Sequence, residues 1–191
     1  MTHTPNFKGQ RAVILHRAGD TTDRLARQLT VLGFEVTARW RPLETAAAVD
    51  VVFVDADEGW DGLLPWTAGE KPVPLVAVLG SEAPGRITWA LDQGADALIA
   101  KPVSLSAVYP ALVMATRRHA AAQAMAERVA ELEERIRLRP LVLRAVQQLM
   151  DRQGLGEAEA YRQLRKAAMQ QRLSLEQCAA TVLTSGQARR A

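Results

Sequence analysis

Three short apolar runs are the strongest secondary-structure signals in the first half of the chain. Residues 11–15, 50–54 and 74–79 are rich in valine, leucine and isoleucine, without the alternation of polar and apolar positions that marks a half-exposed strand. Such runs predict β-strands buried on both faces of a sheet. Residues 34–39 and 97–99 are weaker strand candidates.

Helical patterns lie between these runs. Leu25, Leu29 and Leu32 repeat at spacings of four and three residues before Gly33, and Ile87, Ala90 and Leu91 do so before Gly94. Glycine after a periodic segment is a common helix stop. Five strands alternating with helices predict an α/β fold with a doubly wound, five-stranded parallel sheet over residues 1–105. A site in such a fold is expected at the carboxyl ends of the strands.

A long helix is predicted over residues 106–139. A four-three alternation links positions 111, 115, 118, 122, 125, 129, 132 and 136, which are apolar except for Arg118. This spacing is typical of a coiled coil. The early alanines also suit a helix packed on its own domain, but no domain remains to pack on past residue 120. We therefore expect dimerisation through four apolar side chains: Met125, Val129, Leu132 and Ile136. Pro110 is tolerated if it lies in the first helical turn and would kink the helix if it lies deeper.

Residues 140–191 predict a small module of three helices. Pro140 could start a new helix or kink a continuing one. The pattern gives helices over residues 141–152, ending at Gly154, and over 157–171, beginning after Gly156. A third helix opens at a capping box formed by Ser174 and Gln177 and reaches Leu183 before Gly186. The expected core consists of Ala145, Leu149, Met150, Ala160, Leu164, Ala168, Ala179, Val182 and Leu183.

The two ends of the chain differ in net charge. The net charge is +3, but residues 135–191 contain 11 basic and 4 acidic residues, a balance of +7. A basic end on a slightly acidic chain is typical of polyanion binding. The single cysteine, Cys178, excludes a disulfide within the chain and is interpreted as a packed hydrophobic residue. No apolar run reaches the length of a membrane span and no signal peptide is visible, so we expect a cytoplasmic protein.

The first domain resembles the receiver domain of bacterial response regulators. Asp55 stands at the phosphoacceptor position and Lys101-Pro102 follows the fifth strand. The acidic pair that binds Mg²⁺ in receivers is replaced by His16 and Arg17, which would repel the cation. Leu79 replaces the usual hydroxyl residue. The domain is therefore interpreted as a pseudo-receiver, in which Asp55 forms an ion pair with Lys101 or Arg17 instead of being phosphorylated. The neighbouring Asp57 and Glu58 are interpreted as a solvated acidic loop rather than a metal site.

The C-terminal module resembles the ANTAR domain, an RNA-binding antiterminator module. The resemblance covers about 45 residues and rests on Ala145, Leu149-Met150, Ala160, Leu164-Arg165, Ala168-Met169 and Ala179. The first alanine of the motif is usually followed by lysine, whereas Val146 follows it here, so a basic contact could have moved to Arg144. The resemblance implies no catalysis, no cofactor and no metal.

Together these features predict a transcription antiterminator that binds hairpins in a leader mRNA as a homodimer. The family resemblance implies control by sequestration, with a ligand sensor resembling a solute-binding protein as negative regulator. The expected RNA-binding residues are Arg144, Arg152, Tyr161, Arg162, Arg165, Lys166 and Arg172. Tyr161 could be a stacking platform or a core residue. Two alternatives are a phosphorylation-dependent regulator with RNA output and a DNA-binding regulator. An enzyme is disfavoured because His3, His16 and His119 lie far apart and no nucleophile motif is visible.

Overall fold

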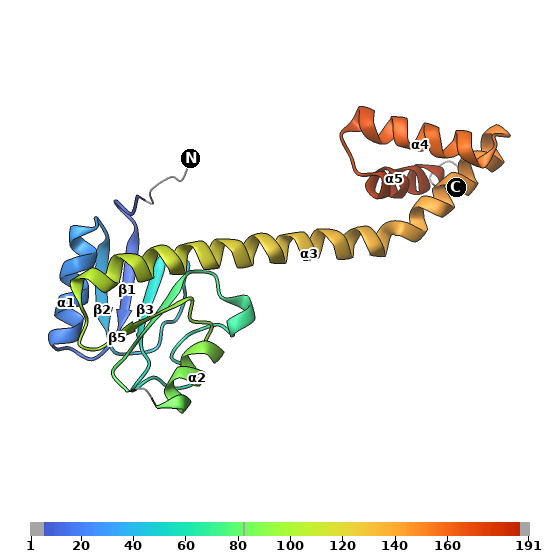
Figure 1. Ribbon diagram of the computed structural model, residues 1–191. Helices are drawn as coiled ribbons and strands as arrows, with labels where there is room; N and C mark the ends of the chain where they lie inside the picture. Colours follow the sequence, from blue (N-terminus) through green and yellow to red (C-terminus); the bar gives the residue numbers. More distant parts are fainter. Residues whose placement is uncertain (1–5, 82, 188–191) are drawn as a thin grey trace. The chain divides into compact units, whose positions relative to one another are not determined.

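A computed structural model of the chain describes residues 6–81 and 83–187. The described residues form two compact units, which divide between Gln123 and Ala124. The first unit contains a five-stranded parallel sheet of order β2-β1-β3-β4-β5 (Figure 1). The strands are β1 (Arg11–Leu15), β2 (Glu35–Arg39), β3 (Val51–Asp55), β4 (Leu75–Leu79) and β5 (Ala97–Ala100). The prediction of a parallel α/β sheet is confirmed, and each predicted strand lies within one residue of its expected bounds.

The central strands are buried on both faces because, apart from Arg11 at the start of β1 and Asp55 at the end of β3, every position carries an apolar side chain. On one face, Ile14, Phe53 and Val78 pack under α1 (Asp20–Val31) and the first turns of α3 (Leu105–Gln153). On the other face, Val13, Val54 and Ala77 pack under α2 (Pro84–Asp92) and the loops that follow β2 and β3. Successive strand residues point to opposite faces, so one unbroken apolar run supplies both layers.

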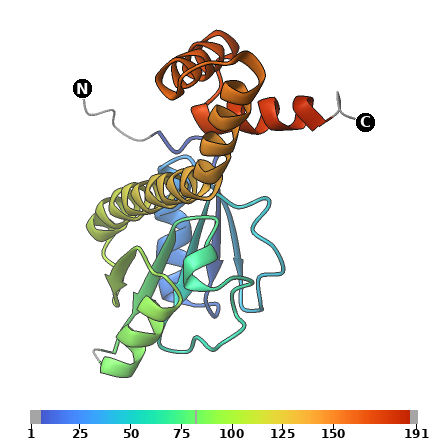
Figure 2. The same cartoon turned by 90° about the vertical axis from the view of Figure 1, so that its right-hand side faces the viewer.

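Two connections differ from the predicted alternation of strands and helices. Residues 40–50, between β2 and β3, form no helix, and residues 56–74, between β3 and β4, contain only the 3-10 turn η1 (Ala68–Glu70) (Figure 2). Prolines at 42, 65, 72 and 74 interrupt helical hydrogen bonding there. Loop side chains, among them Leu43, Leu63 and the tryptophans Trp40 and Trp66, cover this sheet face in place of helices.

Helix α3 is continuous over 49 residues and passes both prolines (Figure 1). Pro110 lies in its second turn, deeper than the tolerated first turn. Pro140 lies in the interior, so the predicted alternative of a kinked continuing helix is confirmed, and a new helix from residue 140 is wrong. Pro140 lacks the backbone N–H of a helical hydrogen bond, and its ring crowds the carbonyl of residue 136. Helix α3 bends in this region (Figure 1). The two compact units meet in sequence at Gln123 and Ala124.

The three-helix module is formed by the end of α3, α4 (Glu157–Gln171) and α5 (Leu175–Gln187). Gly154 has a φ of 65° and ends α3 as expected, and the bounds of α4 match the prediction. The capping box is confirmed, because Gln177 N donates to Ser174 Oγ at 3.1 Å and Ser174 N donates to Gln177 Oε1 at 3.0 Å. Helix α5 continues past Gly186, which is therefore not its stop.

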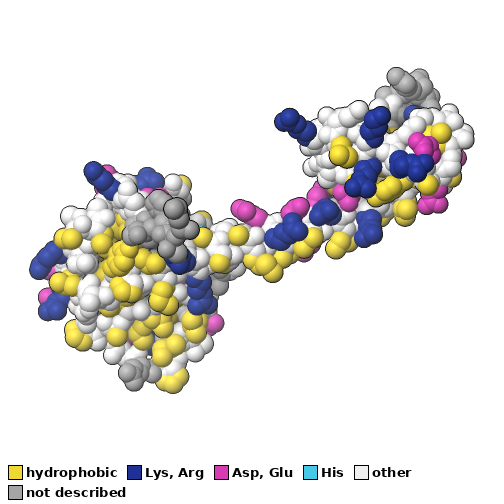
Figure 3. All heavy atoms as spheres, turned by 45° about the horizontal axis from the view of Figure 1, so that its top comes forward, with side chains coloured by type: hydrophobic (Ala, Val, Ile, Leu, Met, Phe, Trp, Pro, Cys, Tyr) yellow, Lys and Arg dark blue, Asp and Glu magenta, His cyan; other side chains and the backbone are white. Residues whose placement is uncertain are grey.

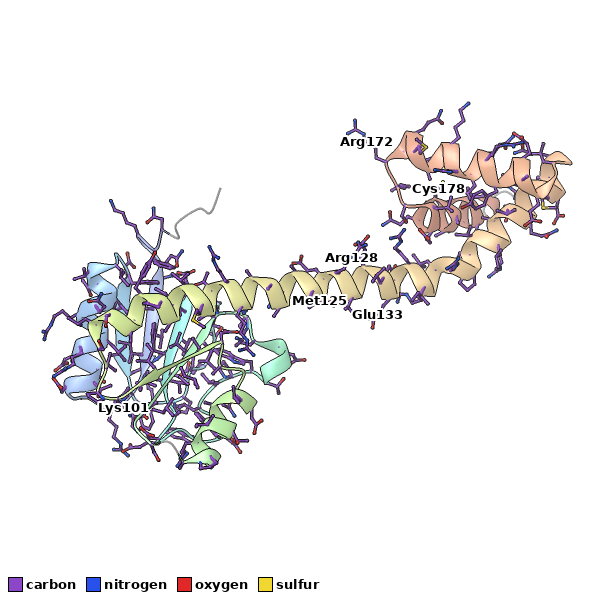
Figure 4. The ribbon with its side chains drawn as sticks, in the orientation of Figure 1. Lys101, Met125, Arg128, Glu133, Arg172 and Cys178 are labelled. Carbon is purple, nitrogen blue, oxygen red and sulfur yellow. The ribbon has the colours of Figure 1, made fainter. Side chains whose placement is uncertain are left out.

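The core of this module is small and built from alanines. Ala145, Ala160, Leu164, Ala168 and Ala179 are buried, while the other predicted members are partly buried against them. Cys178 is also buried in this core (Figure 4), where burial raises the pKa of its thiol. Within the described part of the chain, none of the helices is long and apolar enough to span a membrane.

Candidate functional site

Asp55 lies at the carboxyl end of β3 and is only 2% exposed. Its Oδ1 accepts a hydrogen bond from Lys101 Nζ at 2.8 Å and another from the backbone N of Asp57 at 2.9 Å. Its Oδ2 lies 3.2 Å from His16 Nε2. The predicted ion pair with Lys101 is thus present, and both carboxylate oxygens face donors or cations of the protein itself.

Lys101 also binds Asp57, whose Oδ2 lies 2.9 Å from the lysine Nζ. Asp57 accepts further hydrogen bonds from the backbone N of Gly80 at 2.7 Å and of Ser81 at 3.0 Å. Partial burial acts to raise the pKa of Asp57, but the bonds from Lys101, Gly80 and Ser81 outweigh it and lower that pKa. For Lys101, burial acts to lower the pKa, and the two carboxylates outweigh it and raise that pKa. Asp57 therefore joins the loop after β4 to this site and is not a freely solvated loop residue.

Of the two predicted partners of Asp55, Lys101 forms the ion pair and Arg17 does not. Its guanidinium forms a salt bridge with Glu58 and lies 5.6 Å from the ring centroid of Trp40. Trp40 in turn meets Trp60 edge to face, with ring centroids 5.1 Å apart. The ring of Trp40 attracts the guanidinium through a cation–π contact, and the exposed carboxylate of Glu58 forms an ion pair with it. These two contacts hold Arg17 at the edge of the site.

The site after β3 therefore holds the Lys101 ammonium and the His16 imidazole against the two oxygens of the Asp55 carboxylate. Leu79 ends β4, and its side chain is mostly buried. Figure 4 labels Lys101 in the first unit. Among the described residues, no group of three or more acidic, histidine or cysteine side chains could hold a metal ion. A hard cation would have to displace Lys101 and approach His16, which electrostatics disfavours.

Basic side chains gather on one face of α4 in the second unit. Arg162, Arg165 and Lys166 are exposed and fall on the side of the helix opposite Leu164 and Ala168, because successive residues rotate by about 100°. Arg162 forms a salt bridge with Glu159 one turn earlier. In Figure 3, lysine and arginine side chains are spread over this unit. We refer to Arg162, Arg165 and Lys166 as the basic face of α4.

Arg172 extends this set at the C-cap of α4, where its backbone is left-handed, with φ 56° and ψ 34° (Figure 4). A left-handed arginine is uncommon and lets the chain reverse into the loop before α5. The remaining predicted contacts, Arg144 and Arg152, lie on α3 and are exposed. The Arg152 guanidinium lies against the Gln148 amide one turn earlier. Val146 is 6% exposed, so the position that departs from the ANTAR pattern belongs to the core.

Tyr161 is 43% exposed and lines a groove of about 770 Å³. The groove runs between the second half of α3 and the two shorter helices, and we refer to it as the Tyr161 groove. The sequence interpretation did not include three of its charged residues, Arg135, Arg139 and Glu176. They lie up to 41 positions apart along the chain, so no local pattern could group them. The groove is lined by Leu132, Arg135, Ile136, Arg139, Pro140, Val142, Leu143, Tyr161, Leu175 and Glu176.

The apolar seam of α3 is exposed in the single chain. Met125 and Ile136 are 65% and 70% exposed, and Val129 and Leu132 are 41% and 43% exposed. Figure 4 labels Met125 on the long helix together with Arg128 and Glu133. Ion pairs such as Arg128–Glu131 and Arg137–Glu134 lie along the helix beside this seam.

Comparison with known families gives one match for each half of the chain. Residues 10–116 match the family described as "AmiR, N-terminal", and residues 130–183 match the ANTAR domain. The first match alone covers more than half of the chain. The chain belongs to the AmiR family and carries a C-terminal ANTAR domain. The receiver-like sheet and the three-helix module correspond to these two matches in order.

Two relatives are regulators by name. The transcriptional regulatory protein PdtaR of Mycobacterium tuberculosis is 33% identical over 116 residues, which cover 61% of this chain but only 57% of PdtaR. The aliphatic amidase regulator of Pseudomonas aeruginosa is 29% identical over 166 residues, 85% of each chain. A solved fusion that carries a trimeric coiled-coil segment of yeast Spc42 covers 68% of this chain and 93% of its own. It has a TM-score of 0.50 at 17% identity, a likeness of fold alone.

Proposed function

We propose that this protein is an RNA-binding regulator of transcription antitermination. The observation that carries the proposal is the basic face of α4, formed by Arg162, Arg165 and Lys166 in a module that matches the ANTAR domain. The net charge of +7 over residues 135–191 favours a polyanion as partner.

The RNA target would be a hairpin in a leader transcript. Phosphates meet the arginines and Lys166, while sequence is recognised in the loop, because the A-form major groove is too narrow for side chains. Phosphate contacts fix position and base contacts give specificity. Binding of two hairpins by two modules would stabilise them and prevent a downstream terminator from forming. Arg144, Arg152 and Arg172 are proposed as further phosphate contacts.

A homodimer through the seam of α3 would bring the two modules together. Four apolar side chains, Met125, Val129, Leu132 and Ile136, are each more than 40% exposed in the single chain. Their four-three spacing places them on one side of the helix, where a second copy can cover them. Because the basic faces then act in pairs, the dimer is expected to bind a two-hairpin RNA more tightly than either hairpin alone.

Control by a partner protein is proposed in place of control by phosphate. As the family resemblance implies, a ligand sensor similar to a solute-binding protein would sequester the regulator until its ligand binds. The surroundings of Asp55 support this proposal: His16 and Arg17 stand where receivers carry the acidic pair that binds Mg²⁺, and the His16 imidazole lies 3.2 Å from Asp55 Oδ2. An input other than phosphorylation is then needed.

Two alternatives remain testable. A phosphorylation-dependent regulator requires Asp55 to accept phosphate from a small phosphodonor, which would appear as a mass increase of the intact protein that Asp55→Asn abolishes. A DNA-binding regulator requires α4 and α5 to act as a helix-turn-helix. We expect neither a phosphorylated species nor binding to duplex DNA.

The deciding experiment selects RNA hairpins with randomised loops on the full-length protein. Selected hairpins are then labelled for fluorescence anisotropy and competed with unlabelled duplex DNA of equal length. Enrichment of a defined loop, with hairpin binding that excess duplex DNA does not displace, is the expected result. Equal competition by duplex DNA would favour the DNA-binding alternative, and no enrichment would contradict the RNA assignment.

A further inference from the structure

We infer that the Tyr161 groove binds a single unstacked base of the RNA loop. This inference rests on the proposed RNA-binding function and assigns that function a base-recognition site separate from the basic face of α4. Its wall is largely apolar: Val142 and Leu143 contribute alongside the tyrosine ring, and Leu132 and Ile136 lie where the groove meets the seam of α3. A volume of about 770 Å³ exceeds what one base requires, so a base and part of its sugar fit inside.

Tyr161 has the position expected of a stacking platform. It lies on α4 between the buried side, marked by Ala160 and Leu164, and the basic face, which begins at Arg162. The ring is 43% exposed, and the hydroxyl makes no hydrogen bond within the described residues. An aromatic face beside a row of arginines can stack a base while the adjoining phosphates reach the basic face. The sequence left Tyr161 open between stacking and core packing, and its exposure favours stacking.

The charged groups of the groove complement a nucleotide. Arg139 makes no salt bridge in the described part of the chain and is free to meet a phosphate, while Arg135 has only Glu131, at 3.9 Å. Glu176 likewise has no ion-pair partner among the described residues. Its carboxylate can only accept hydrogen bonds, so it favours bases that carry an exocyclic amino group over uracil.

The position of Glu176 is fixed by its helix. The capping box of Ser174 and Gln177 defines the first turn of α5, and Glu176 lies between these two residues. The side chain is half-buried, which limits its rotamers. A carboxylate held in this way beside an aromatic ring is suited to recognise the edge of a stacked base, whereas a loosely held one would contribute little specificity.

A second copy of the chain is the competing occupant of the groove. Leu132 and Ile136 belong to both the groove and the seam of α3, where the proposed dimer covers them, so the base site is the rest of the groove, around Tyr161, Val142 and Leu143. Occupation by an apolar helix would desolvate Arg135, Arg139 and Glu176, and burying such charges without new partners is unfavourable. A nucleotide supplies a phosphate for the arginines and hydrogen-bond donors for the carboxylate. Charge complementarity therefore favours RNA.

Fluorine NMR provides the test, because the chain has two tyrosines. Full-length protein is labelled with 3-fluorotyrosine and titrated with a hairpin selected on the wild type, and Tyr161→Phe assigns the signals. Tyr109, 36% exposed in the first unit, is the internal control. We expect the Tyr161 signal to shift on RNA binding while the Tyr109 signal stays unchanged.

Affinity measurements use the same pair of residues. Tyr161→Leu should weaken hairpin binding by roughly five- to 150-fold, the range typical of losing one stacked base. The salt dependence of hairpin binding should be the same for this variant as for the wild type, because the phosphate contacts remain. The matched change Tyr109→Leu should leave affinity unaltered. Selection on Glu176→Gln should relax the preference for an amino-bearing base at one loop position.

The outcomes separate this inference from the proposed function. An unmoved Tyr161 signal at RNA saturation, with Tyr161→Leu binding as tightly as wild type, would overturn the groove assignment and leave the RNA function standing. A Tyr161 signal that moves on dimerisation and does not move further when RNA is added would assign the groove to a second copy. Failure of the wild type to bind any selected hairpin would overturn both.

Discussion

Charged substitutions in the seam of α3 should convert a dimer into monomers. The perturbation is Val129→Glu combined with Leu132→Glu, two adjacent seam positions on the part of α3 that lies in the second unit. Both side chains are exposed in the single chain, so the change should leave the fold of either unit intact. The apolar contact between two helices, and not the helix itself, is what the substitutions remove.

The expected magnitude follows from exposure. Val129 and Leu132 are 41% and 43% exposed. Complete burial of such a side chain contributes about 1.5–3 kcal/mol, so the remaining two-fifths contributes roughly 0.6–1.2 kcal/mol per residue. A dimer contains four such side chains, which gives roughly 2–5 kcal/mol. Since 1.4 kcal/mol corresponds to a tenfold change, Kd should rise on the order of 30- to 3,000-fold. The cost of desolvating four carboxylates adds to this loss.

The assay is sedimentation equilibrium or light scattering over a concentration series, with circular dichroism to monitor helix content. Ala124→Glu combined with Ala130→Glu is the matched control, because it adds the same charge at exposed positions outside the seam. Wild type and control should be dimers of equal affinity, and the seam variant should be monomeric. A seam variant that keeps the wild-type mass at every concentration would place the interface elsewhere and refute the reasoning.

Three further predictions concern the receiver-like domain. Asp55→Asn should retain antitermination in a reporter strain, because Asp55 is proposed not to accept phosphate, and a loss of activity would contradict the pseudo-receiver interpretation. Lys71→Met should lower the free energy of unfolding by about 3–5 kcal/mol, because it leaves the carboxylate of Asp96 buried without its lysine. Adding Asp96→Asn should recover part of that loss in urea unfolding. The lowered pKa of Asp57 contributes stability above the unfolded-state pKa near 4 that is lost as pH falls through the folded-state pKa. Asp57→Asn should therefore flatten the loss of stability between about pH 5 and pH 3, and an unchanged slope would argue against the bonds from Lys101 and the loop.

Local patterns in the sequence predicted the strands and the C-terminal helices well, for identifiable reasons. The strand at 11–15 is a short apolar run with branched side chains, a pattern that favours a buried strand over a helix. Helix α4 is bounded by Gly156 and by the left-handed Arg172, so its ends are fixed by backbone conformation. The seam of α3 was visible because heptad spacing is a property of the helix alone.

Features that depend on tertiary contacts could not be predicted as well from the sequence. The connections between β2 and β3 and between β3 and β4 are loops whose side chains, such as Trp40 and Trp66, cover the sheet. No periodicity in the sequence encodes such contacts. Arg17 was placed near Asp55 by analogy of position, but a tryptophan and Glu58 from other segments hold it at the rim. The Tyr161 groove joins residues from three helices. Only the folded module brings Arg139 and Glu176 to one surface.

The salt dependence of hairpin binding by wild type and by Arg165→Ala combined with Lys166→Ala tests the central claim most directly. For Z neutralised phosphates, log K should fall against log salt with a slope of about −0.7Z to −0.9Z, so loss of two cations per module should flatten the slope. We expect the variant to bind more weakly and with a flatter slope, while its dimer mass and helix content match the wild type. Wild-type binding that is tight yet nearly independent of salt, or an unchanged slope in the variant, would contradict RNA binding through the basic face of α4.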